Sequence, residues 1–177
     1  TIIAFTRNKP GILYRVANLF LRRKINIESL TVSETETMGV SRFTIVVKGD
    51  KAIIEKVVKQ LYRIIEMLKV YEAEDKDLLY KELAFIRIFA KTPGARSEIQ
   101  DIVRMFGGSV SYIGSTYIIA EKTGPEHEIA GLVTMLRPFG IQEFIRSGRI
   151  AMLKEPHESN AQSHVRRPTS RVTSGLE

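Results

Sequence analysis

The chain contains no cysteine and only three histidines, and its many acids and bases show no recognisable catalytic spacing. Without cysteine it cannot form a disulfide, a thiolate metal site or a cysteine nucleophile, and this composition fits a reducing, cytoplasmic location. Three histidines, His127, His157 and His164, lie at spacings that match neither a metal site nor a catalytic triad. No apolar run approaches the ~20 residues that a membrane span requires. We therefore expect no metal site, no membrane span and no histidine-based catalysis.

The short motifs of common enzyme classes are also absent from the sequence. There is no G-x-G-x-x-G, no P-loop and no G-x-S-x-G nucleophile elbow. The net charge of +7 comes from lysines and arginines that are scattered among acids rather than clustered. Such a surface gives no specific indication of nucleic-acid binding. We interpret the chain as non-catalytic and expect no nucleic-acid partner.

The first half of the chain does contain a clear order of apolar patterns. Apolar residues recur at helical spacing from Ile12 to Phe20 and from Ile53 to Ile65, and Asp50 is placed to cap the second of these helices. Short apolar or β-branched runs predict strands at residues 2–6, 26–33, 41–48 and 68–73. The predicted order is βαββαβ. RNA-binding modules share this order, but residues 41–48 lack their glycine-aromatic pattern.

The second half repeats the same order with different residues. A turn is expected at residues 92–94, and Ser97 with Gln100 is typical of a capping box that opens a helix. Gly107 and Gly108 should end that helix, and Pro125 should begin another. Strands are expected at residues 83–90, 110–113, 117–121, 142–146 and 149–153, the last two as one strand or a bent pair. The sequence thus predicts an α+β fold with two ferredoxin-like βαββαβ units in tandem.

We divide the chain into a first domain at residues 1–75, a linker at 76–82, a second domain at 83–154 and a polar tail at 155–177. The tail is rich in Ser, Thr, Gln and Arg, a composition that predicts disorder for an isolated segment. Units of about 75 residues bury only ~60% of the surface of the unfolded chain, and their sheets have free edges. We therefore expect the protein to oligomerise or to pack on a partner.

The turn at residues 8–11 is the strongest candidate for a binding site. A helix start leaves backbone N–H groups unpaired and carries about half a positive charge, so it favours a carboxylate. Gly11 has no Cβ to block a ligand, and the amides of Asn8 and Asn26 can bind a carboxylate or an ammonium group. Leu13 and Ile27 could enclose an aliphatic side chain. This pattern indicates a receptor for a small zwitterion.

A purely structural role for the two asparagines is the alternative. Asn8 would then hydrogen-bond its own loop, and Asn26 would cap the entry to a strand. The second unit offers a comparison, because Lys91 and Thr92 precede its Pro-Gly pair where the first unit has Asn8 and Lys9. Since the second unit keeps the fold order without the amides, we expect it to pack rather than to bind a ligand.

Several segments resemble the regulatory (small) subunit of acetolactate synthase, also called acetohydroxyacid synthase. In the first half these are residues 8–16, 26–32 and 41–45, and in the second half residues 81–84, 121–124 and 143–148. The resemblance covers residues 1–154 and is most specific at 26–32. It implies that residues 1–75 form an ACT domain, which binds amino acids and dimerises, and that residues 83–154 form a C-terminal ferredoxin-like domain.

The resemblance also implies a function for the candidate site. The family is expected to form a homodimer that binds valine or another branched-chain amino acid at the interface of its ACT domains. Asn8, Gly11, Ile12 and Leu13 of one chain, with Asn26 and Ile27 of the other, would hold the ligand. A larger catalytic subunit would carry thiamine diphosphate, magnesium and FAD, and the small subunit would activate it and confer feedback inhibition. A free-standing amino-acid sensor without an enzyme partner is the alternative.

Overall fold

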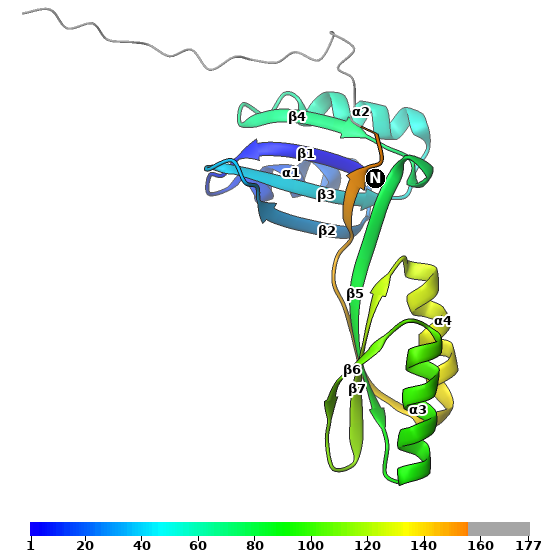
Figure 1. Cartoon of the computed structure of the whole chain (residues 1–177). Coiled ribbons are helices and arrows are strands. Elements are labelled where there is room, and N and C mark those ends of the chain that lie inside the picture. Colours follow the sequence, from blue (N-terminus) through cyan, green and yellow to red (C-terminus); the bar gives the residue numbers. More distant parts are fainter. Residues whose placement is uncertain (156–177) are drawn as a thin grey trace, which may run out of the picture.

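A computed structural model describes residues 1–155, so the predicted tail at 155–177 lies, except for Glu155, outside the described residues. The first sheet has the strand order β2-β3-β1-β4, and its neighbouring strands are antiparallel. Its strands are β1 (Ile2–Arg7), β2 (Ile27–Glu34), β3 (Val40–Val47) and β4 (Met67–Glu72). Two helices, α1 (Ile12–Leu21) and α2 (Lys51–Leu61), cover one face of this sheet (Figure 1).

The helical face of the first sheet holds the core of the first unit. Ile12, Val16 and Phe20 of α1 follow one another at four-residue spacing, so all three lie on one side of the helix and are buried. They pack with Ile2 and Phe43 of the central strands. This core fixes α1 against the sheet and thereby sets the position of the loop that precedes it.

The second sheet repeats the first, with the order β6-β7-β5-β8. Its elements are β5 (Leu78–Phe89), α3 (Pro93–Met105), β6 (Ser109–Ile113), β7 (Tyr117–Gly124), α4 (Glu126–Leu136) and β8 (Ile141–Arg146), with short 3-10 turns at Asp75–Asp77 and Arg137–Phe139. Ile86, Ile99 and Leu132 lie in its core. The tandem βαββαβ organisation predicted from the sequence is confirmed.

Two predicted helix boundaries are wrong. Helix α2 ends at Leu61, and Ile65 lies beyond it with 79% of its surface exposed, because the chain turns there to enter β4 beside β1. Helix α3 begins at Pro93, since the Thr92 hydroxyl accepts from the Ala95 N–H at 3.2 Å. Proline suits this first helical position, so the expected turn at residues 92–94 and the capping box at Ser97 are replaced by an earlier start. Asp50 is the N-cap residue of α2 but makes no side-chain capping bond.

The expected linker at residues 76–82 is largely strand. Residues 78–81 of β5 pair with β9 (Ile150–Leu153), while residues 82–89 of the same strand belong to the second sheet. We call residues 78–81 with 150–153 the β5–β9 ribbon. Its buried side packs against Ile3 on the face of the first sheet that carries no helices. Figure 1 shows the ribbon crossing that sheet, so β9 leaves the second unit and covers the first.

A cluster of charges fastens the ribbon to the first unit. The Arg149 guanidinium is buried, donates to Asp75 at 2.8 Å and to the Thr1 hydroxyl at 3.1 Å, and lies 4.0 Å from the centre of the Tyr80 ring. Its backbone N–H donates to the Ser29 hydroxyl at 3.0 Å. The buried Glu82 carboxylate lies 3.8 Å from the Arg149 Nε. These contacts join segments far apart in the sequence, so the relative position of ribbon and sheet depends on them.

Candidate functional site

The loop at residues 8–11 lies at the end of β1 and is held by the backbone on both sides. The Arg7 N–H donates to the Glu66 carbonyl at 2.9 Å, and the Asn8 N–H donates to the Gly39 carbonyl at 2.7 Å. Gly11 then adopts a φ of 85°, which is the left-handed region that costs a residue with a Cβ roughly 1–2 kcal/mol. Glycine at this position lets the chain turn directly from the loop into α1.

The first turn of α1 presents unpaired N–H groups. The Ile12 N–H reaches the Lys9 carbonyl only at 3.4 Å, and no backbone carbonyl in residues 1–155 accepts from the N–H of Leu13 or Tyr14. The N-cap residue gives no side-chain capping bond, and the first turn contains no acidic residue. No side chain of the N-cap or the first turn therefore offsets the positive end of the helix dipole. A carboxylate placed there would gain both hydrogen bonds and favourable electrostatics.

The structural alternative requires the Asn8 side chain to hydrogen-bond within its own loop, and it makes no such bond. Its Nδ2 donates to the Glu34 carboxylate at the end of β2. Sequence reasoning missed Glu34 because the contact depends on the strand order. This order brings the C-terminal ends of β1 and β2 to the same end of the sheet. Glu34 adds a negative charge beside the helix start. The loop thus combines donors for a carboxylate with an acceptor for an ammonium group, which is the pattern that a zwitterion needs.

The other residues predicted to contact the ligand differ in how far they are exposed. Ile12 is only 6% exposed and packs in the core, so it can offer a ligand only its backbone. Leu13 is 47% exposed next to the free N–H groups. Ile27 is half-buried. Asn26 donates to the Glu28 carboxylate at 3.2 Å, a local bond of the kind that the structural alternative predicts.

Asn8 and Asn26 do not meet within one chain. Strands β1 and β2 run parallel on either side of β3, so Arg7 and Glu34 mark one end of the sheet and Ile2 and Ile27 the other. Strand β2 has 8 residues, which at about 3.3 Å per residue separates its ends by roughly 23 Å. Among residues 1–155, strand β2 pairs only with β3, so no other strand occupies its outer edge. A site that uses both asparagines therefore requires a second chain.

The part of the chain that the structure describes contains neither a metal-binding cluster nor a membrane-spanning helix. No group of three or more His, Cys, Asp or Glu side chains is placed to hold a metal ion in residues 1–155. None of the described helices is long and apolar enough to cross a membrane. The loop before α1 is thus the candidate site that the geometry favours.

Comparison with known proteins assigns both halves of the chain to one kind of protein. Residues 2–69 match the family model of the AHAS small subunit-like ACT domain, and residues 81–155 match that of the small subunit of acetolactate synthase. The chain is 42% identical over 154 residues to a probable acetolactate synthase small subunit of Archaeoglobus fulgidus, covering 87% of this chain and 96% of that one.

Two further relatives give the same result. The acetolactate synthase small subunit of Aquifex aeolicus is 42% identical over 149 residues, which cover 84% of this chain and 78% of that one. The solved structure of the acetolactate synthase small subunit from Thermotoga maritima superposes with a TM-score of 0.79 at 34% identity, covering 87% of this chain and 96% of that one. The likeness therefore extends through both units and includes their arrangement.

Proposed function

The chain belongs to the family of acetolactate synthase small subunits, and on that premise we propose that it is a non-catalytic regulatory subunit. It activates a larger catalytic subunit and makes that subunit sensitive to valine or another branched-chain amino acid. Thiamine diphosphate, magnesium and FAD belong to the catalytic partner in this proposal. This chain supplies the effector site and the contacts that transmit its occupancy.

The observation that carries the proposal is the open start of α1. The N–H groups of Leu13 and Tyr14 are free to bind the effector carboxylate, and Gly11 leaves room for its approach. The Glu34 carboxylate, held beside the loop by Asn8, suits the effector ammonium group. The exposed Leu13 side chain gives an aliphatic effector an apolar surface. Each part of a branched-chain amino acid thus has a chemical counterpart at this end of the sheet.

A homodimer formed through β2 would complete the site. The outer edge of β2 is free to pair, and exposed edges are common points of association. Two-fold antiparallel pairing reverses the second strand, so the start of β2 in the second chain lies next to the end of β2 in the first. Asn26 and Ile27 of the second chain would then lie near Asn8 and Glu34 of the first. An effector bound there bridges both chains and stabilises their pairing.

Calorimetry with valine tests the effector site. We expect Asn26→Ala to weaken valine binding at least tenfold, because a hydrogen bond to a charged group contributes about 1.5–3 kcal/mol. Asn18→Ala is the matched control, since Asn18 lies within α1 away from its first turn. The absence of valine binding to the wild type at millimolar concentration would refute the effector assignment.

Mixing two variants with weakened valine binding tests whether the site is shared between chains. In a heterodimer of Asn8→Ala with Asn26→Ala, one site carries both changes and the other carries neither. Random pairing of equal amounts should therefore restore about a quarter of the wild-type valine sites. If each chain holds a complete site by itself, mixing restores none.

Addition of the chain to a catalytic acetolactate synthase subunit tests the regulatory role. We expect a higher rate of pyruvate condensation and a rate that falls when valine is added. A coupling free energy of ~1–3 kcal/mol between the two sites is the usual scale for such control. Valine binding without any effect on the catalytic subunit would identify the chain as an amino-acid sensor with no such partner.

A further inference from the structure

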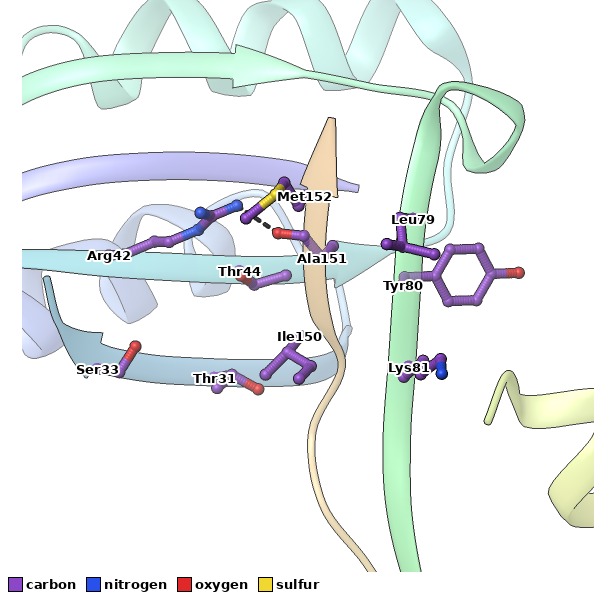
Figure 2. Close-up of a pocket in the computed structure, with 10 residues that line it drawn as sticks. All are labelled: Thr31, Ser33, Arg42, Thr44, Leu79, Tyr80, Lys81, Ile150, Ala151 and Met152. Atoms are coloured by element: carbon purple, nitrogen blue, oxygen red, sulfur yellow. Dashed lines mark hydrogen bonds between the residues drawn. The ribbon is translucent and has the colours of Figure 1, made fainter. Parts of the chain in front are cut away.

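A groove lies on the face of the first sheet that carries no helices, beside the β5–β9 ribbon (Figure 2). Its volume is about 350 Å³, which falls within the usual range for small-molecule sites. The polar floor comes from β2 and β3, and the ribbon forms the wall. None of the residues 8–13 lines it, so this groove is separate from the start of α1.

The wall of the groove is apolar and exposed. Alternate ribbon residues such as Leu78 and Ala151 are buried against the sheet. The residues between them, Leu79, Ile150 and Met152, are 58%, 62% and 61% exposed. Three large apolar side chains in two short paired segments contribute little to the core. Clusters of this kind mark binding surfaces more often than isolated exposed side chains do.

The charge of the groove is positive. Its 10 lining residues include Arg42 and Lys81 but no aspartate or glutamate. The Arg42 guanidinium is held in place by donating to the Ala151 carbonyl and by lying 5.4 Å from the centre of the Phe5 ring. None of the residues that line the groove carries a carboxylate, so the charge of this guanidinium is not neutralised within the groove. A guanidinium fixed in this way is suited to bind a carboxylate.

The floor contains an unpaired hydroxyl. The Thr31 Oγ1 is buried and has no hydrogen-bond partner among the described residues. Buried polar groups in native proteins almost always have partners, so each exception calls for an explanation. The close approach of Gly148, whose Cβ would lie 2.4 Å from this oxygen, provides one: the chain before the ribbon covers the hydroxyl, so a ligand in the groove does not reach it.

We propose that this groove binds a small aliphatic carboxylate that lacks an ammonium group. The carboxylate contacts Arg42, and the alkyl part lies against Ile150 and Met152. A zwitterionic amino acid is disfavoured here, because its ammonium group would meet two cations and no acid. The ligand class therefore differs from that proposed for the start of α1, and the two sites stand or fall independently.

Titration of the full chain with 3-methylbutanoate, followed by calorimetry and saturation-transfer NMR, tests this proposal. Ile150→Trp should fill the groove and weaken binding at least tenfold, and because Ile150 is exposed the fold should tolerate the change. Ile145→Trp is the matched control, since Ile145 is 55% exposed on β8 and lines a different surface cavity. Arg42→Met keeps an apolar stem over Phe5 but removes the charge, and should also weaken binding at least tenfold.

Three results would overturn the proposal. One is the absence of binding to the wild type at tens of millimolar. Another is equal binding to the wild type and to Ile150→Trp. The third is displacement of 3-methylbutanoate by an equal concentration of valine, which would show that the groove does not discriminate against the ammonium group. Loss of valine binding in Asn26→Ala, with 3-methylbutanoate binding retained, would show that the two sites are distinct.

Discussion

Substitution of Gly148 tests how tightly the ribbon is joined to the first sheet. A Cβ at this position would lie 2.4 Å from the Thr31 Oγ1 and 3.1 Å from the Leu30 carbonyl oxygen. Both distances are shorter than normal contacts, so Gly148→Ala forces the ribbon and β2 apart. Overpacking of this kind costs ~1–3 kcal/mol. For a chain of this size each kcal/mol lowers Tm by roughly 2–4 °C, so we expect Gly148→Ala to lower Tm by about 2–12 °C.

A second substitution shows whether the Thr31 contact causes the loss. Thr31→Ala alone should change stability by less than about 0.5 kcal/mol, because the hydroxyl it removes has no hydrogen-bond partner. Combined with Gly148→Ala, it removes the closest clash and should recover more than half of the lost Tm. Thermal unfolding followed by circular dichroism measures all three variants.

Gly94→Ala is the control for replacing a glycine as such. A Cβ at Gly94 would meet nothing within 4 Å, and the residue lies in the first turn of α3. We expect wild-type stability or a gain of up to ~1 kcal/mol, because alanine favours helix. The reasoning is refuted if Gly148→Ala melts with the wild type, or if Thr31→Ala gives no recovery.

Three further substitutions probe the Arg149 contacts of the ribbon, the loop before α1 and the second unit. Arg149→Met should lower the free energy of unfolding by ~3–5 kcal/mol in urea titrations, because it leaves the buried Glu82 with less compensation. Gly11→Ala should cost roughly 1–2 kcal/mol at a φ of 85° and shift the start of α1, which valine calorimetry would register as weaker binding. The hydrogen bond from Arg146 lowers the pKa of Glu126 below its ordinary value of 4.5, so this pair stabilises the fold above that pH and the contribution is lost on acidification through the lowered pKa. Because the pair is exposed, Glu126→Gln should remove at most about 1 kcal/mol at neutral pH and nothing in strong acid, which urea unfolding at the two pH values would measure.

The element order and the family were predictable from the sequence because both depend on local patterns. Helical spacing in α1 and β-branched runs in β3 are set by neighbouring residues, and the matches at 2–69 and 81–155 confirm the resemblance to acetolactate synthase small subunits. The start of α3 was also encoded locally. Thr92 before Pro93 is a cap followed by a first-turn proline, and this pair outweighed the capping box at Ser97.

The features that sequence reasoning missed depend on residues far apart in the chain. Residues 78–81 become strand because β9, some seventy positions later, pairs with them. Glu34 joins the candidate site because the order of the strands brings the ends of β1 and β2 together. The placement of Asn8 and Asn26 at opposite ends of the sheet also follows from topology rather than from spacing. A pattern within one segment carries none of this information.

The continuity of β5 has a mechanical consequence. A strand of 12 residues separates its ends by roughly 36 Å at about 3.3 Å per residue, and it belongs to the ribbon at one end and to the second sheet at the other. No loop interrupts it, so a rotation at one end is passed on to the other. A tilt of only about 5° where it rests on the first sheet would displace its far end by roughly 3 Å. A slight rearrangement where β5 rests on the first sheet therefore becomes a displacement of the second unit without any flexible connection between the two.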